Sequence, residues 1–132
     1  MAISVIDNFK AINDNYGHMA GDEILIDFAR NVQNNLRKED VIGRMGGEEF
    51  AIFLPNIPLD AAVTFAERLR TIIEAKPVLT GKGEINYTIS IGITNIESQT
   101  SIEQALDAAD SAMYEAKRNG RNKVIYKRIE AS

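Results

Sequence analysis

Apolar positions along the chain follow two periods, one typical of strands and one typical of helices. A short run rich in β-branched residues, A-I-S-V-I at 2–6, predicts a buried strand. Apolar residues then recur at helical spacing from about 20 to 36, with Asp22 and Glu23 in the expected first turn, where the helix dipole favours acids. Two short apolar runs at 40–44 and 49–54 flank a pair of glycines, which predicts a β-hairpin.

The second half of the chain repeats this alternation. A segment from Pro58 to about Ala75 opens with proline and carries one apolar face, so it predicts a second long helix. Isoleucines and a tyrosine at alternate positions predict a strand over 85–94, and a third long helix is expected over 102–119. A last short strand is expected at 123–126.

This order of elements predicts an α/β (α+β) fold. Strands separated by helices, with one hairpin in the middle, are typical of a βαββαβ core of the ferredoxin-like or palm type, in which helices flank a central and mostly antiparallel sheet. With 132 residues, we expect a single domain over 1–132. Hydrophobic residues at 45% and charged residues at 26% exclude a disordered or fibrous chain.

Charge and composition narrow the classes of partner. The net charge of −4 argues against nucleic acid as a partner, because broad phosphate-backbone binding usually shows as a basic excess. The sequence has no cysteine, which excludes disulfides and thiolate metal sites. It has no apolar run long enough to span a bilayer, so we expect no membrane segment and a cytoplasmic location.

The hairpin carries the first candidate chemistry, R-M-G-G-E-E-F at 44–50. In one interpretation, Glu48 and Glu49 are solvated charges at the tip, and the glycines only supply positive φ angles. In the other, Gly46 and Gly47 leave room for a ligand while the carboxylates hold Mg²⁺, a hard cation often bound by one or two carboxylates and phosphate oxygens. The motif alone leaves both interpretations open.

Two further segments could bind phosphate. The stretch N-F-K-A-I-N-D-N-Y-G-H-M-A-G-D at 8–22 predicts a loop at a strand end, with free backbone N–H groups suited to polyphosphate. Lys117 and Arg121 lie four residues apart near the end of the third long helix. They either clamp phosphates or are solvated cations favoured by the helix dipole.

Taken together, the motifs resemble the GGDEF domain family of diguanylate cyclases, in its G-G-E-E-F form, over nearly the whole chain. The matching segments are F-K-x-I-N-D-x-Y-G-H-x-x-G-D at 9–22, R-x-x-D at 37–40, G-G-E-E-F at 46–50, S-I-G at 90–92 and A-D-x-A-M-Y-x-A-K-x-x-G-R-N at 109–122. The helix and the D-x-L-T-x-L-x-N-R segment that normally precede the first strand in this family are absent from the sequence.

The resemblance implies condensation of two GTP molecules into cyclic di-GMP and two pyrophosphates. It implies Mg²⁺ (or Mn²⁺) as cofactor, a two-fold homodimer for catalysis and an upstream sensory domain in the full-length protein. By position, Glu48 and Glu49 would share metal binding and activation of the 3′-hydroxyl. Asn13 and Asp22 would bind the guanine edge.

The remaining roles implied by the resemblance concern phosphates and product. The triphosphate would be held by the backbone at Asn8 and Phe9 together with Lys10, Lys117 and Arg121. The product-inhibition motif would bind cyclic di-GMP through Arg37 and Asp40, with Arg68 as a further ligand. From the residues alone, Arg37 and Asp40 could equally form a surface ion pair.

One position departs from the family's D-x-D-x-F-K pattern, because this chain has V-I-D-N-F-K. Aligned without a gap, Val5 stands where a metal-binding aspartate is expected, and the site would rest on Glu48, Glu49 and the Ile6 carbonyl. With two residues missing, Asp7 would instead be the displaced ligand. The alternative functions are therefore a catalytically impaired receptor for cyclic di-GMP or GTP, or a purely structural module.

Overall fold

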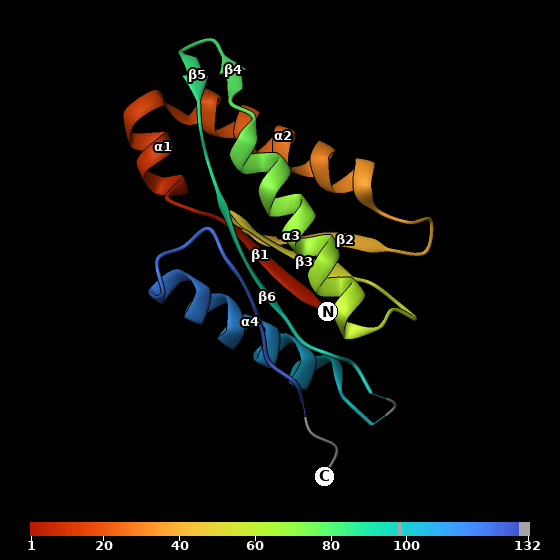
Figure 1. Ribbon diagram of the computed structural model, residues 1–132. Helices are drawn as coiled ribbons and strands as arrows, with labels where there is room; N and C mark the ends of the chain where they lie inside the picture. The colour runs from red at the N-terminus through yellow and green to blue at the C-terminus, as the bar shows by residue number, and fades with distance from the viewer. Residues whose placement is uncertain (98, 130–132) are drawn as a thin grey trace.

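The computed structural model describes residues 1–97 and 99–129 of the chain, and its main feature is a five-stranded sheet with helices on both faces (Figure 1). In chain order the elements are β1 (Ala2–Ile6), α1 (Phe9–Tyr16), α2 (His18–Asn35), β2 (Val41–Gly46), β3 (Glu49–Phe53), α3 (Leu59–Ala75), β4 (Val78–Thr80), β5 (Gly83–Ile85), β6 (Ile89–Ile93), α4 (Ile102–Arg118) and β7 (Val124–Tyr126). The strand order is β2-β3-β1-β6-β7, and only β6 and β7 pair in parallel. This architecture confirms the predicted fold class.

The sheet is buried on both faces by different helices. On one face, α2 and α3 cover the even-numbered side chains of β3 and the odd-numbered ones of β6, where the rings of Phe28 and Phe50 lie 4.7 Å apart. On the other face, α4 packs on Ile3 and Val5 of β1 through Met113. Because both faces are covered, β1 and β6 are buried at every position, which explains why their sequences are nearly continuous apolar runs.

Contact between α4 and β6 is unusually close. A Cβ atom placed on Gly92 would lie 2.1 Å from the Ala109 carbonyl oxygen and 2.2 Å from the Met113 backbone nitrogen. The side of α4 that faces the sheet is made mostly of alanines, at 105, 109, 112 and 116. The helix backbone can therefore approach the strand closely at Gly92, because the glycine has no side chain and the alanines of α4 have only a methyl group.

The first polar segment is a correction to the sequence analysis. The sequence predicts a loop over residues 8–22, but they form α1 and the start of α2, which meet at Gly17. In α1 only Ile12 is buried and Phe9 is partly buried against the core, so the apolar face of this short helix is narrow among many polar residues. Asp22 consequently lies in the second turn of α2, because the helix begins at His18 and not at about residue 20.

The predicted strand over 85–94 is also shorter than expected. Its first residue, Ile85, belongs to β5 and pairs with β4 in a separate two-stranded ladder, and only Ile89–Ile93 belong to the main sheet. The alternation of buried side chains nevertheless continues through Ile85, Tyr87 and Ile89. Between the two strands the Tyr87 hydroxyl donates a 2.7 Å hydrogen bond to Asp27 on α2, so side-chain contacts replace ladder pairing.

The described helices include none that combines the length and the apolar character needed to cross a bilayer.

Replacing Gly92 with alanine tests the close packing of α4 on β6. The added methyl group would overlap backbone atoms that cannot rotate away, so we expect a loss of stability at the upper end of the roughly 1–3 kcal/mol typical of overpacked cores. Urea unfolding measures the change. Gly43→Ala is the matched control, because a Cβ atom there meets no atom within 4 Å. Equal midpoints for the two variants would contradict the packing described here.

Candidate functional site

The hairpin between β2 and β3 presents two adjacent glutamates. Gly46 and Gly47 have φ angles of 156° and 50°, in the region that favours glycine, and the pairing of the two strands shifts register between Arg44 and Gly46. The Arg44 guanidinium donates to the Gly47 carbonyl oxygen at 2.9 and 2.7 Å, which closes the turn. Glu48 and Glu49 follow, and both are half-buried. The Arg44 side chain therefore fixes the conformation of this turn.

The end of β1 lies directly beside these glutamates. The Ile6 backbone nitrogen donates to the Glu48 carbonyl oxygen at 3.2 Å, and Val5 is the register partner of Glu49. The Val5 side chain is only 2% exposed and belongs to the apolar cluster under α4. Among the described residues, no three histidine, cysteine, aspartate or glutamate side chains gather as a metal cluster. The position next to Glu49 thus offers a hydrocarbon surface in place of a further oxygen ligand.

Glu49 lies in an acidic environment. Burial raises the pKa of its carboxyl group, Asp110 on α4 and the neighbouring Glu48 raise it further, and Lys117 opposes the rise. Asp110 was not singled out by the sequence analysis, although it belongs to the A-D-x-A-M-Y segment at 109–114. Only the fold brings that helix next to β3, so no local pattern could have paired Asp110 with Glu49.

Asp7 has a different environment from the two glutamates. Its carboxylate is 3% exposed and accepts hydrogen bonds from the Ser90 hydroxyl at 2.7 Å, the Thr88 hydroxyl at 2.7 Å and the Asn122 backbone nitrogen at 3.0 Å. A carboxylate with three donors has little lone-pair capacity left for a cation. These contacts favour a structural role for Asp7 over the metal ligation suggested by the sequence.

The N-terminus of α1 follows Asp7 immediately. Asn8 adopts a left-handed conformation with φ of 56°, the helix starts at Phe9, and no side chain caps its first turn. The first N–H groups of an α-helix have no partner within the helix, and they favour anions such as phosphate. Lys10 is exposed on this first turn. The predicted phosphate site at Asn8, Phe9 and Lys10 is therefore a helix N-terminus, not a loop.

The two residues expected to contact guanine lie at the junction of α1 and α2. A Cβ atom on Gly21 would lie 1.8 Å from the Asn13 side-chain oxygen, so only glycine allows the Asn13 amide to rest on α2 at this point. Asp22 is the next residue and is exposed. The structure thus brings Asn13 close to the backbone that carries Asp22, as a shared binding role requires.

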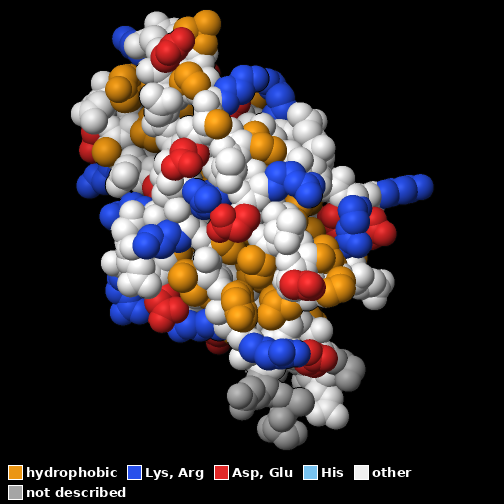
Figure 2. All heavy atoms as spheres, viewed as in Figure 1, with side chains coloured by type: hydrophobic (Ala, Val, Ile, Leu, Met, Phe, Trp, Pro, Cys, Tyr) orange, Lys and Arg blue, Asp and Glu red, His pale blue; other side chains and the backbone are white. Residues whose placement is uncertain are grey.

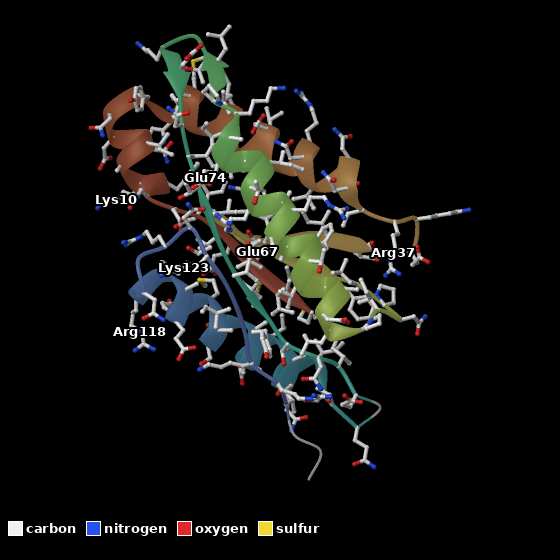
Figure 3. The ribbon with its side chains drawn as sticks, viewed as in Figure 1. Lys10, Arg37, Glu67, Glu74, Arg118 and Lys123 are labelled. Atoms are coloured by element: carbon white, nitrogen blue, oxygen red, sulfur yellow. The ribbon has the colours of Figure 1, made fainter. Side chains whose placement is uncertain are left out.

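Lys117 and Arg121 flank the C-terminal end of α4. The Lys117 ammonium lies 5.3 Å from the centre of the Tyr114 ring, and Arg121 is exposed in the following turn. Figure 3 shows Lys10, Arg118 and Lys123 toward the same end of the molecule, with Arg37 at the opposite end. Figure 2 shows acidic and basic side chains interspersed over this face of the molecule, so it carries no single-sign patch.

Arg37 and Asp40, which the resemblance assigns to product inhibition, lie away from the hairpin glutamates and pair with each other. The Arg37 guanidinium pairs with the Asp40 carboxylate at 2.7 Å and also donates to the Pro55 carbonyl oxygen at 2.7 Å. Burial, the largest single influence, raises the pKa of Asp40, but the hydrogen bonds from the Arg37 side chain and backbone outweigh it and leave that pKa below its ordinary value. Arg37, Asp40 and Arg68 line one pocket of about 460 Å³.

Comparison with known proteins shows the family of the chain. The chain matches the family described as "Diguanylate cyclase, GGDEF domain" over residues 1–123. It is 44% identical over 119 residues to diguanylate cyclase DgcM of Escherichia coli, a match that covers 90% of this chain and 28% of DgcM. The chain thus spans less than a third of the length of that relative.

Solved structures show the same fold. The GGDEF domain of DgcB from Caulobacter crescentus, crystallised with c-di-GMP, superposes with a TM-score of 0.90 at 29% identity, covering 95% of this chain and 75% of that one. The active GGEEF domain of a diguanylate cyclase from Vibrio cholerae superposes with a TM-score of 0.83 at 35% identity, covering 98% of this chain and 83% of that one. The diguanylate cyclases among these relatives are enzymes of the nucleotidyltransferase type. The chain belongs to the diguanylate cyclase GGDEF-domain family.

The electrostatic setting of Glu49 gives a direct prediction. Asp110→Asn removes a neighbouring negative charge, so the pKa of Glu49 should fall toward its ordinary value, whereas Lys117→Met should raise it further. Carbon-13 NMR titration of the side-chain carboxyl groups measures both shifts. Because the pKa of Glu49 is raised in the folded state, its ionisation lowers stability as the pH rises through that pKa, and Asp110→Asn should reduce this loss. Unchanged titration in both variants would place Asp110 and Lys117 too far from Glu49 to act on it.

Proposed function

We propose that this chain is a diguanylate cyclase domain that condenses two GTP molecules into cyclic di-GMP and two pyrophosphates. The observation that carries the proposal is the meeting, around the end of β1, of the Glu48–Glu49 hairpin and the uncapped N-terminus of α1. The names of the relatives support the same chemistry, since DgcM is a diguanylate cyclase and the DgcB domain binds c-di-GMP.

Substrate binding would divide between the two ends of α1. At one end, the Asp22 carboxylate would accept hydrogen bonds from the N–H groups of the guanine edge, and the Asn13 amide would both donate and accept. At the other, the N–H groups at Asn8 and Phe9 would hold the phosphates, with Lys10 supplying positive charge. Binding at both ends would fix the orientation of the ribose and the α-phosphate between them.

Two further cations and the hairpin glycines complete the phosphate site in this proposal. Lys117 and Arg121 would approach the triphosphate from the end of α4. Gly46 and Gly47 present no side chain, so the nucleotide can come close to the hairpin backbone. Positive charge there would offset the charge that builds up as pyrophosphate leaves.

The residues present suit a hard divalent cation such as Mg²⁺ or Mn²⁺. Glu48, Glu49 and the Ile6 carbonyl supply oxygen donors, and Mg²⁺ is usually bound by one or two carboxylates together with substrate phosphates. When bound, the ion neutralises phosphate charge and lowers the pKa of an oxygen that it touches. Val5 leaves the set one carboxylate short of the family pattern.

At the α-phosphorus, each reaction step forms one P–O bond and breaks another. The 3′-hydroxyl oxygen of one GTP bonds to the α-phosphorus of the other, the bond to the β-phosphate oxygen breaks, and pyrophosphate leaves with its electron pair. Glu48 and Glu49 would share the task of drawing the proton from the hydroxyl. Two such steps close the ring, so a second copy of the domain must present the second GTP in a two-fold dimer. An upstream sensory domain, expected from the greater length of the relatives, would control this pairing.

Cyclic di-GMP would also bind in the pocket lined by Arg37, Asp40 and Arg68, and would there inhibit the enzyme. A phosphate of the product carries the charge that two arginines recognise. The ion pair between Arg37 and Asp40 holds one of these arginines in place before the ligand arrives.

Incubation with GTP and Mg²⁺ or Mn²⁺ at high protein concentration, followed by chromatography, tests the cyclase proposal. We expect cyclic di-GMP from the unmodified chain, and at least a roughly 100-fold slower reaction from Glu49→Gln, which keeps the shape of the side chain but not its basicity. Glu84→Gln, an exposed position on β5, is the control and should retain the full rate. Absence of product from the unmodified chain would refute the cyclase proposal for this sequence.

Val5 favours a second candidate, a domain that binds cyclic di-GMP or GTP without turnover. Its side chain is buried against the apolar cluster under α4, so this position cannot donate an oxygen ligand to a cation beside Glu49. Calorimetric binding of cyclic di-GMP by a chain that makes no product would support this receptor role.

The substitution Val5→Asp separates the two candidates. Without a divalent ion, the new carboxylate would be buried in apolar surroundings, and we expect a loss of about 2–4 kcal/mol in stability. Mg²⁺ should restore much of the melting temperature and raise turnover above that of the unmodified chain. Val5→Asn is the control, because it is similar in shape but carries no charge, and Mg²⁺ should not rescue it. Equal responses of the two variants would exclude Val5 as the reason for impaired activity.

A further inference from the structure

We infer that Asn122 is a positioning residue for the triphosphate: its side chain holds the turn carrying Arg121 against α3, while its backbone N–H bonds to the end of β1. The inference rests on the proposed binding of GTP and concerns the same site. Neither the motif analysis nor the comparisons give this asparagine a role.

The turn after α4 has a backbone that needs support. Gly120, Arg121 and Asn122 have φ angles of 113°, 63° and 50°, three successive residues in the left-handed region. Glycine adopts this region freely, but a residue with a Cβ atom is disfavoured there, although asparagine is among the more tolerant. Within the turn, the Arg121 backbone nitrogen bonds to the Ala116 carbonyl oxygen at 2.9 Å. The conformation of Arg121 must therefore be stabilised by contacts outside its own residue.

Asn122 supplies such contacts on two sides. Its backbone nitrogen donates to the buried Asp7 carboxylate at 3.0 Å. Its side-chain oxygen accepts from the Arg70 guanidinium at 3.1 Å, and its side-chain nitrogen donates to the Glu74 carboxylate. Arg70 is itself held by Glu67, 3.0 Å away on the same helix. The turn is thus fastened both to the end of β1 and to α3.

The type of side chain matters at this position. An amide has one acceptor and one donor end, and these match the donor on Arg70 and the acceptor on Glu74. Aspartate would place a second carboxylate against Glu74, and alanine would offer neither group. Asparagine also tolerates the left-handed backbone, so one residue type satisfies both requirements.

Asn122 lies between the two parts of the proposed phosphate site, which are the N-terminus of α1 and Arg121. Asp7 precedes Asn8 and Phe9, whose N–H groups begin α1, and Asn122 follows Arg121. Across the described part of the chain, the Arg121 side chain makes no hydrogen bond or ion pair, so it is available to a ligand. The backbone hydrogen bond from Asn122 to Asp7, together with the side-chain contacts of Asn122 to α3, therefore fixes the distance between the helix N-terminus and the arginine.

Nucleotide titrations of the Asn122→Ala and Asn122→Asp variants test this role. The probes are a non-hydrolysable GTP analogue with Mg²⁺ and guanosine, which lacks phosphates. We expect both variants to bind the GTP analogue about tenfold more weakly, equivalent to about 1.4 kcal/mol, and to bind guanosine as the unmodified chain does. The aspartate side chain has nearly the same shape as asparagine, so the Asn122→Asp variant can be used for the test if Asn122→Ala does not fold.

Asn119→Ala is the matched control in the same turn, because Asn119 has a negative φ of −90° and contributes only backbone hydrogen bonds in the described structure. It should bind both probes normally. A general loss of folding would weaken both probes together, so loss for the GTP analogue alone supports positioning. Unchanged affinity for the GTP analogue in both Asn122 variants would overturn the inference and leave the cyclase proposal intact. If the unmodified chain bound neither probe, both this inference and the cyclase proposal would be overturned.

Discussion

The functional end of this domain depends on one buried carboxylate. Asp7 terminates the central strand and accepts hydrogen bonds from Thr88, Ser90 and Asn122, which lie far along the chain. A buried carboxylate without such donors is costly, so the three segments are obliged to meet at this point. The direction in which the chain leaves β1, and with it the start of α1, follows from that meeting.

Two residues before Asp7, the same strand has an apolar environment. Val5 is surrounded by Ile3, Ala109 and Met113, while its register partner Glu49 shares a region with Asp110 and Lys117. An apolar cluster and a group of charged side chains thus lie directly beside each other. A valine at this point contributes packing and no oxygen atom of its side chain.

Long elements with a clear apolar period could be predicted from the sequence, and so could the hairpin, because each is decided by contacts within a short window. The helix α1 was not predicted, because it is only eight residues long and its polar side chains leave a narrow apolar face, of which only Ile12 is buried. The motifs supplied most of the candidate site residues. They did not reveal Asp110 beside Glu49 or Arg70 beside Asn122, since these contacts exist only after distant helices pack against the sheet.

Helix α3 also joins the two sites physically. Arg68 lines the pocket beside Arg37 and Asp40, whereas Arg70 and Glu74, within two turns of it, hold Asn122. The pocket lined by Arg68 and the turn bearing Arg121 are therefore supported by the same helix.

The hydrogen bond between Asp7 and Asn122 spans 115 positions of the sequence, and this has a consequence for biosynthesis. A ribosome delivers β1 and the hairpin long before the turn at 119–123 emerges. The nascent domain can build its core around Thr88 and Ser90, yet the hydrogen bond that ties this turn to the end of β1 can form only after nearly all of residues 1–123, the part that matches the family, has been synthesised. The junction between β1 and the turn after α4 is therefore one of the last contacts of the domain to form during translation.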